Sequence, residues 1–166
     1  DGTPSLTRSE KMELLRKGER GATAWKRLGR LDKSAEMWER IAKTYESWGL
    51  FSRQIPCLRS LASIYDTQGR YNESLQARLR AAALARQAQD NALAAEIGQE
   101  MVTSSLEGGN LEAALETFME LVPVFEDAGD VRGAASMLEA RGELLARDGQ
   151  YLAAISDLQS ARETYM

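Results

Sequence analysis

Few residues of this chain could carry out catalysis. Glu139 and Glu143 stand four residues apart, so on one helix they would lie one turn apart and could work as a general acid and base. Cys57 follows Pro56, and a thiol at the start of a helix can have a lowered pKa and become nucleophilic. Carboxylates with this spacing are usually just exposed, however, and lone cysteines are usually half-buried thiols. We therefore expect a protein that is not an enzyme.

Composition and missing motifs exclude other kinds of site. The sequence contains no histidine and one cysteine, which excludes Ser-His and Cys-His nucleophiles, histidine-ligated metals and disulfides within the chain. Gly108 and Gly109 belong to no phosphate-binding motif, because neither GxxxxGK[ST] nor GxGxxG surrounds them. Trp25, Trp38 and Trp48 could enclose a ligand, but the first two fall in packing columns described below. We expect no cofactor and no metal.

Charge is distributed unevenly along the chain. The net charge is −4, yet residues 1–83 hold 16 Lys and Arg against 10 Asp and Glu, while residues 84–166 hold 5 against 15. Such an asymmetry can steer a charged partner. Glutamates are interleaved in the basic half, so we expect no nucleic-acid partner. Apolar runs are far shorter than the roughly 20 residues of a membrane-spanning helix, so we expect no membrane span.

Glycines mark a repeat of twenty residues. They stand at Gly29, Gly49, Gly69, Gly109, Gly129 and Gly149, and Gln89 occupies the one position of this series without a glycine. Glycine commonly ends a helix in the left-handed conformation, because it has no Cβ atom to make that conformation costly. The spacing therefore predicts eight helical segments of equal length, each ended by a glycine or its substitute.

Positions between the glycines show the same period. Five residues after a stop comes a small residue: Ser34, Ser74, Ala94, Ala114, Ala134 and Ala154. Large or apolar columns contain Trp38, Leu58, Phe118, Leu138 and Leu158, then Ile41, Leu61, Ala81, Met101, Leu121 and Ala161, then Trp25, Tyr45, Tyr65, Phe125, Leu145 and Tyr165. Within one segment they follow the spacing of an amphipathic helix. We expect these columns to form the core, with small residues where helices approach closely.

Side chains that can cap a helix mark the predicted starts. They are Asp32, Asn72, Asp90, Asn110 and Asp130, each at or near the first residue after a stop. Thr7 and Glu10 have the spacing of a capping box for the first helix. Pro56 falls early in its predicted helix, where its missing N–H should be harmless. Pro123 falls deep inside its helix and predicts a kink.

The connection between paired helices resembles that of the tetratricopeptide repeat (TPR). A glycine, an apolar residue two places later and a small residue five places later occur in residues 69–74, 109–114 and 149–154, and more weakly in 29–34. The preceding helix is also similar, with Leu58, Leu61, Ala62 and Tyr65. The period of 40 residues resembles the variety in kinesin light chains, Pins-type adaptors, MalT-type regulators and Rap-type peptide sensors. Arg78 and Gly98 depart from the family pattern, which has a large residue at these positions.

This resemblance implies an all-α fold. It would be a right-handed α-α superhelix, a TPR-like solenoid, of about eight antiparallel helices in four helix-turn-helix repeats. We expect a flexible leader at residues 1–8 and a helical repeat domain at 9–166, with repeats at about 10–49, 50–89, 90–129 and 130–166. We also expect the chain to be a piece of a longer protein.

The first helix of each pair lines the concave face in this family. Here those helices would span roughly 10–28, 54–68, 90–107 and 131–148. Positions between their packing columns would form a partner-binding groove: Arg16, Arg20, Thr23, Arg27, Arg59, Ser63, Asp66, Glu96, Gln99, Glu100, Thr103, Glu139 and Glu143. Such a groove would be basic at its N-terminal end and acidic at its C-terminal end. It would suit a segment whose charges run in the opposite order.

These features favour a cytoplasmic, non-catalytic interaction scaffold that binds a peptide or helix of another protein. Two alternatives stay open. The last helix carries Tyr151, Ile155, Leu158 and Tyr165, which predicts an uncovered face for self-association, as in an assembly domain. The similarity to MalT-type and Rap-type proteins would instead allow a regulatory domain that senses a ligand or peptide. The groove residues could also be ordinary solvent-exposed positions, with the binding surface elsewhere.

Overall fold

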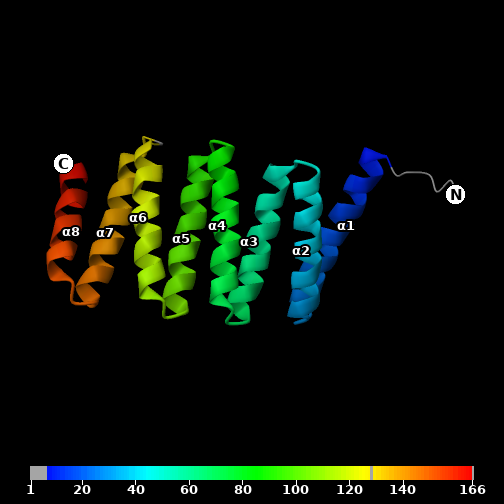
Figure 1. Cartoon of the computed structure of the whole chain (residues 1–166), viewed down its shortest axis with the longest axis horizontal. Coiled ribbons are helices and arrows are strands. Elements are labelled where there is room, and N and C mark those ends of the chain that lie inside the picture. The colour runs from blue at the N-terminus through cyan, green and yellow to red at the C-terminus, as the bar shows by residue number, and fades with distance from the viewer. Residues whose placement is uncertain (1–6, 128, 166) are drawn as a thin grey trace. The chain divides into compact units, whose positions relative to one another are not determined.

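Eight α-helices make up the described part of the structure. The computed structural model describes residues 7–127 and 129–165, and this part of the chain contains no strand. The helices are α1 Arg8–Arg27, α2 Leu31–Ser47, α3 Phe51–Thr67, α4 Tyr71–Gln87, α5 Asn91–Glu107, α6 Leu111–Asp127, α7 Val131–Arg147 and α8 Tyr151–Tyr165 (Figure 1). This count confirms the sequence prediction. Six residues of the expected leader lie outside the described part, whereas Thr7 and Arg8 belong to the start of α1.

The helix stops lie where the glycine spacing predicts them. Each of the six glycines of the series has a positive φ between 67° and 82°, and Gln89 has a φ of 59°. At the stop after α1, the Gly29 amide donates to the carbonyl of Lys26 and the Arg30 amide donates to that of Trp25. The corresponding amides of Gln89 and Asp90 do the same. These bonds satisfy carbonyls at the helix end, as in a Schellman motif.

The strained stop at Gln89 gives a stability prediction. The left-handed conformation costs a residue with a Cβ atom about 1–2 kcal/mol. Glycine avoids this steric cost, and the extra backbone entropy that glycine loses on folding costs less. We expect Gln89→Gly to raise the free energy of unfolding by up to about 1 kcal/mol, measured by urea denaturation. The matched control Gly69→Gln should lower it by a similar amount. Equal stability of Gln89→Gly and the parent chain would contradict this reading.

Capping follows the predictions at the starts of α1, α5, α6 and α7. Thr7 and Glu10 form the expected capping box, with the Thr7 amide donating to the Glu10 carboxylate at 2.7 Å. The side chains of Asp90, Asn110 and Asp130 each accept the backbone N–H three residues later. Asp32 and Asn72 instead lie one residue inside their helices.

Both prolines considered above lie inside helices. The expectation that Pro56 is harmless is wrong, because α3 begins at Phe51 and Pro56 is its sixth residue. At that position the missing N–H would have paired with the carbonyl of Ser52. Pro123 lies inside α6, which runs without interruption from Leu111 to Asp127. The predicted kink at Pro123 stays a prediction.

The chain divides into two compact units, residues 1–77 and 78–166. In the first unit α2 packs against both α1 and α3. Its core contains Trp38, Ile41, Tyr45, Leu58, Leu61 and Tyr65 of the predicted columns together with Ala22, and all of these residues are buried. The small column also contributes, because Ser34 is buried and its hydroxyl donates to the Ala22 carbonyl at 2.7 Å. That contact lets α1 and α2 approach closely.

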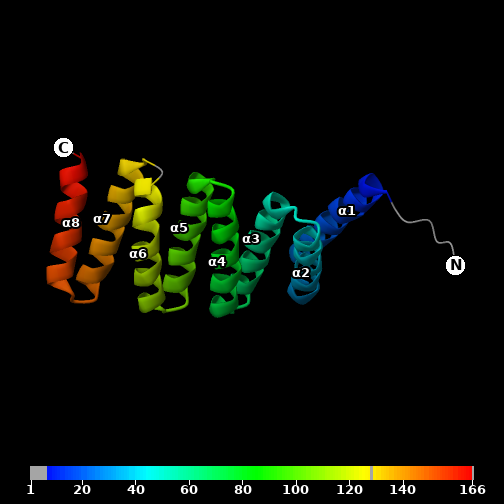
Figure 2. The same ribbon diagram turned by 45° about the horizontal axis from the view of Figure 1, so that its top comes forward.

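In the second unit, α5 contacts α6, α6 contacts α7 and α7 contacts α8. Figures 1 and 2 show these helices side by side. The core shared by α5, α6 and α7 contains Ala95, Val102, Ala114, Phe118, Leu121, Phe125, Ala134 and Met137. Leu158 is an exception to its predicted column, because 38% of it is exposed on the last helix. Within the described residues, no helix is both long and apolar enough to cross a membrane.

Candidate functional site

In the first unit, α1 and α3 share a face. The Lys26 ammonium donates a hydrogen bond to the Ser63 hydroxyl at 2.8 Å, across 37 residues of sequence. Ser63 is one of the predicted groove residues, whereas Lys26 is not among them. The bond shows that the first helices of neighbouring pairs lie close enough for side chains to meet, as the proposed groove requires.

Exposed arginines stand along α1. Arg16, Arg20 and Arg27 are exposed. Arg20 and Glu13 approach to 3.7 Å, with side chains 70% and 51% exposed, so their pairing contributes little to stability. The hydroxyl of Thr23, also exposed, donates to the carbonyl of Glu19 within the helix. These guanidinium groups can therefore reach a carboxylate on a partner.

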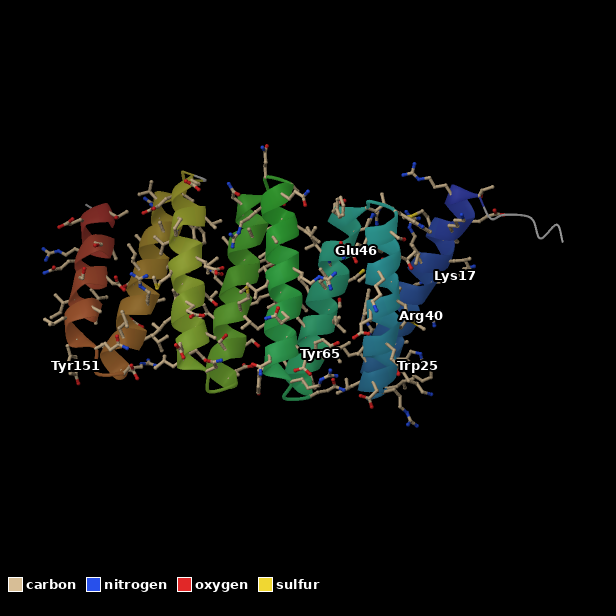
Figure 3. The ribbon with its side chains drawn as sticks, viewed as in Figure 1. Lys17, Trp25, Arg40, Glu46, Tyr65 and Tyr151 are labelled. Carbon is tan, nitrogen blue, oxygen red and sulfur yellow. The ribbon has the colours of Figure 1, made fainter. Side chains whose placement is uncertain are left out.

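The α3 side is more enclosed. Arg59 and Asp66, both predicted groove residues, are half-buried and already interact with other groups of the protein. Near the end of the helix the Arg70 guanidinium lies 4.3 Å from the centre of the Tyr65 ring, which Figure 3 labels. Such a cation–π contact holds the turn after α3 against the helix. We infer that α1 offers more accessible charge than α3.

Two buried tyrosines bind glutamates of the preceding helix. The Tyr45 hydroxyl donates to the Glu19 carboxylate at 2.7 Å, and the Tyr65 hydroxyl donates to the Glu39 carboxylate at 2.6 Å. Both pairs span 26 residues, so the same contact recurs one twenty-residue step along the chain. Burial, followed by the hydrogen bond to the carboxylate, raises the pKa of Tyr45 above its ordinary value and that of Tyr65 to about 12. These carboxylates therefore serve the fold.

Cys57 is not a nucleophile. Its side chain is 1% exposed and the thiol donates to the Arg53 carbonyl at 3.4 Å. Burial, with the negative charge of Glu19 as a second cause, raises the pKa of the Cys57 thiol to about 12. The thiolate that nucleophilic chemistry needs is thereby disfavoured. The possibility of a lowered pKa is wrong, and the thiol is more fully buried than the half-buried state we expected.

Alkaline pH should weaken the first unit. Cys57 and Tyr65 keep their protons in the fold up to about pH 12 but lose them at lower pH when unfolded, so the unfolded state gains stability as pH rises above about 9. The stabilisation is therefore complete below pH 9 and is lost as pH rises toward 12. We expect the urea midpoint to fall steadily from pH 9 to pH 11. Cys57→Ala should flatten this slope, and a slope identical to that of the parent chain would count against the assignment to Cys57.

In the second unit, one predicted groove carboxylate has an internal partner. The Arg78 guanidinium approaches the Glu100 carboxylate to 3.2 Å, with side chains 8% and 30% exposed. Arg78 stands where the TPR pattern has a large apolar residue, and its long stem is buried there while the charge is paired. Glu100, which is one of the predicted groove residues, therefore neutralises the buried charge of Arg78.

A pocket opens between α5 and α7. It has a volume of about 220 Å³ and is lined by Val102, Leu106, Phe118, Ala140, Glu143, Leu144 and Arg147. Phe118 of α6 is 4% exposed and belongs to the core, while Leu106 is 44% exposed and reaches the surface. The pocket is therefore an apolar hollow between the first helices of two pairs. Glu143 and Arg147 add one charge of each sign to its lining.

The other groove residues predicted for the second unit are exposed on α5 and α7, the two helices beside this pocket. Glu96, Gln99 and Thr103 of α5 and Glu139 of α7 are exposed. The Thr103 hydroxyl donates to the Gln99 carbonyl, so it is used within the helix. Glu96 also interacts with another group of the protein. Of the residues predicted from sequence, Glu143 is the one that lines the pocket.

Sequence reasoning missed the apolar residues of the pocket. Leu106 and Leu144 are not among the predicted groove residues, because that prediction contained only polar and charged positions between the packing columns. The one available signal was that Leu106 is apolar, whereas the positions twenty residues before and after it hold Arg86 and Glu126. Across the described residues, no group of three or more Asp, Glu or Cys side chains could hold a metal ion.

Solved structures share this architecture. BtubC (BKLC) from P. vanneervenii has a TM-score of 0.64 at 16% identity, covering 92% of this chain and 63% of that protein. A Podosopora anserina protein, described as a kinesin light chain with nearly identical TPR-like repeats, has a TM-score of 0.64 at 14% identity and covers 91% and 74%. Rap protein complexed with Competence and Sporulation Factor has a TM-score of 0.56 at 17% identity and covers 91% and 44%.

These comparisons concern the fold. The chain spans less than two thirds of the length of BtubC and less than half of that of the Rap protein. No protein-family model and no curated protein sequence matches it. The helix bounds, the left-handed stops and the similarity to solved structures all indicate the same fold. The chain has the fold of the TPR-like repeat proteins.

Proposed function

We propose that this chain is a non-catalytic scaffold that binds a peptide or helical segment of another protein. The observation that carries the proposal is the apolar pocket between α5 and α7, lined by Val102, Leu106, Phe118 and Leu144 among others. Apolar hollows with a few polar groups at their edge are the usual sites where a partner's anchor side chain is buried. We propose that one large apolar side chain of the partner occupies this pocket.

The charges near the pocket suggest what flanks that anchor. Glu139 and Glu143 are exposed one turn apart on α7, so a Lys or Arg of the partner could lie along this helix beside the anchor. Arg147 lies one turn further and also lines the pocket. A partner segment with an aromatic or aliphatic anchor and a nearby basic residue fits these groups best.

The first unit offers a separate surface of opposite character. Arg16, Arg20 and Arg27 are exposed on α1, and guanidinium groups bind carboxylates through paired hydrogen bonds. We propose that acidic residues of a partner bind here. A charge-reversed pair, Arg16→Glu with Arg20→Glu, should weaken binding of an acidic segment while leaving the pocket unaffected.

The burial of Cys57 and the ligand complex of a protein with a similar fold favour binding over catalysis. Cys57, the one candidate nucleophile discussed above, is enclosed and has a raised pKa. The Rap protein, which shares the fold, was solved in complex with Competence and Sporulation Factor, and this supports a ligand-binding role for helical repeats of this kind. A regulatory domain that senses a signalling ligand is the narrower version of the proposal. We place the scaffold in the cytoplasm.

Selection from a displayed peptide library tests the pocket. The immobilised 166-residue chain should enrich peptides that share a large apolar residue with Lys or Arg nearby. Leu106→Asp should weaken binding of such peptides by at least about 10-fold, because a charge in an apolar pocket repels the anchor and costs at least about 1.4 kcal/mol. Glu143→Arg should weaken the peptides with basic residues by a similar factor.

Matched controls lie on α6. Met119 is 63% exposed and does not line the pocket, so Met119→Asp changes an exposed apolar residue in the same way as Leu106→Asp. Glu116→Arg likewise controls for the reversal at Glu143. Both controls should bind within about 2-fold of the parent chain. Enriched peptides that bind Leu106→Asp and Glu143→Arg as tightly as the parent would refute the pocket assignment.

A further inference from the structure

A second pocket of the second unit lies between two helix turns. It opens between the turn after α4 and the turn after α6, which lie at the same end of this unit (Figure 1). Its volume of about 380 Å³ falls within the usual range of ligand pockets, roughly 300–1,000 Å³. We name it the turn pocket, and its lining residues are Gln89, Asp90, Asn91, Ala92, Phe125 and Asp130.

Two positions of this lining depart from the twenty-residue repeat. Gln89 stands where the other six stops have glycine, and it keeps the left-handed conformation with a φ of 59°. Asn91 stands two places after its stop, where every other stop is followed by an apolar residue: Leu31, Phe51, Tyr71, Leu111, Val131 and Tyr151. Departures from the local rules of a fold are expected at functional sites. The repeat explains neither amide, whereas a role in this pocket explains both.

A glycine brings a carboxylate and an aromatic ring together at the turn pocket. Gly133 is the third residue of α7, and glycine is a poor helix former. A Cβ atom at this position would lie 2.5 Å from Asp130 Oδ2 and closer still to the ring of Phe125. The missing side chain therefore leaves the space in which both lining groups sit.

The turn pocket carries negative charge. Asp90 and Asp130 each accept one backbone N–H through Oδ1, and this leaves Oδ2 of each carboxylate for a further donor. The two helix N-termini contribute about half a positive charge each, so two carboxylates leave the pocket negative by about one charge. No Lys or Arg is among its lining residues.

We propose that the turn pocket binds an arginine side chain of the same partner segment whose apolar anchor occupies the α5–α7 pocket; the choice of partner rests on the proposed function. A guanidinium can donate to the second oxygens of Asp90 and Asp130 and can stack on the ring of Phe125. The side-chain carbonyls of Gln89 and Asn91 can accept its remaining N–H groups. A lysine ammonium has three donors and no flat face, so it matches this lining less well.

One exposed stripe of α5 joins the two pockets. Ala92 lines the turn pocket and Leu106 lines the α5–α7 pocket. Between them the exposed positions of α5 are Glu96, Gln99 and Thr103, and this three- and four-residue spacing keeps all five on one side of the helix. At 1.5 Å per residue, Ala92 and Leu106 lie about 20 Å apart. A partner helix of about 14 residues, or an extended segment of about 6, spans that distance.

Other occupants fit the turn pocket less well. Asp90 and Asp130, each with one oxygen already in a cap, offer a divalent cation fewer oxygen ligands than it prefers. A carboxylate or phosphate would be repelled by both side chains. A neutral side chain would gain nothing from the two charges, so a neutral probe distinguishes this case.

Titration of the 166-residue chain with N-acetylarginine amide, followed by nuclear magnetic resonance, tests the pocket directly. Backbone signals of residues 89–92 and Gly133 should shift and saturate with a Kd of about 1–10 mM. N-acetylcitrulline amide, a neutral analogue of similar shape, should bind at least about 10-fold more weakly. Asp90→Asn with Asp130→Asn should weaken arginine amide binding by a similar factor. Asparagine caps a helix as well as aspartate does, so the urea midpoint should change little.

A matched control removes two other charges at the same end of the second unit. Glu126 and Asp127 are exposed and do not line the turn pocket, so Glu126→Gln with Asp127→Asn should bind the arginine amide within about 2-fold of the parent chain. The proposal would be overturned by an absence of shifts at residues 89–92 up to about 50 mM arginine amide. Equal binding of the citrulline amide, or equal affinities of the two double variants, would also overturn it.

A further pair of measurements separates this proposal from the proposed function. Leu106→Asp should leave arginine amide binding within about 2-fold, because Leu106 lines the other pocket. In a peptide that binds the α5–α7 pocket, an arginine about 20 Å from the anchor should tighten binding by about 10-fold, and Asp90→Asn with Asp130→Asn should remove that gain. A peptide that binds there but gains nothing from an arginine at any spacing would contradict this proposal and leave the proposed function standing. Arginine amide binding without any peptide bound at Leu106 would contradict the proposed function and leave the turn pocket as an arginine site.

Discussion

Asp157→Ala should destabilise the second unit by about 3 kcal/mol. Asp157 is 7% exposed and accepts two hydrogen bonds from Arg141, at 2.6 Å from Nε and 2.7 Å from Nη2. This bidentate pair joins α7 to α8, and the hydrogen bond to Asp157 raises the pKa of Arg141. Removing the carboxylate leaves a partly buried guanidinium without its counter-ion. Urea denaturation followed by circular dichroism measures the loss.

A double-mutant cycle separates pairing from burial. Arg141→Met alone should also be destabilising, because it leaves the Asp157 carboxylate buried without its partner. Asp157→Leu alone should be destabilising too, because it leaves the Arg141 guanidinium without its counter-ion. The double variant Arg141→Met with Asp157→Leu should be less destabilised than either single change, since apolar residues of similar size can replace a buried ion pair at little cost. Single changes whose effects simply add in the double variant would show that the pair contributes no coupling.

Gly98→Val should destabilise the α5–α6 contact by about 2–3 kcal/mol. A Cβ atom built at Gly98 would lie 2.1 Å from Leu121 Cδ2 and 2.7 Å from its Cγ, much closer than any real contact. Leu121 is 2% exposed and is part of the core, so it has no free space into which to move. Overpacking of this kind costs about 1–3 kcal/mol, and a β-branched residue adds a rigid second methyl group.

Two further variants check the cause of this loss. Gln99→Val places the same side chain at the exposed neighbouring position of α5 and should change stability by less than about 0.5 kcal/mol. Leu121→Ala should rescue part of the effect, so that the double variant is more stable than the sum of the single changes implies. Additive effects at Gly98 and Leu121 would contradict a steric origin.

The fold could be predicted because each helix stop is a local event. A single residue with a positive φ ends a helix, so the glycine series determined the turns, and Gln89 adopts the same conformation by position alone. The start of α3 was missed by about three residues, because its N-cap is Leu50, which makes no side-chain hydrogen bond. Without a polar cap in the sequence, the consequence for Pro56 could not be seen.

The candidate site was harder to predict because it depends on pairs of residues far apart in sequence. Glu100 is engaged by Arg78, and Ser63 is engaged by Lys26, across 22 and 37 residues. Polar spacing on one helix carries no information about such partners. The pocket also depends on Leu106 remaining partly exposed, which follows from how α5, α6 and α7 pack. Periodicity could therefore predict the helices and their stops, but the pocket between α5 and α7 required the tertiary structure.

Backbone assignment of the chain by nuclear magnetic resonance tests the twenty-residue unit most directly. Carbon chemical shifts should show helices over the eight segments, interrupted near residues 29, 49, 69, 89, 109, 129 and 149. The coupling constants and shifts of Gln89 should match a left-handed residue, as at the glycines. A helix that continues through one of these positions, or interruptions out of step with them, would contradict the account of how this sequence builds its fold.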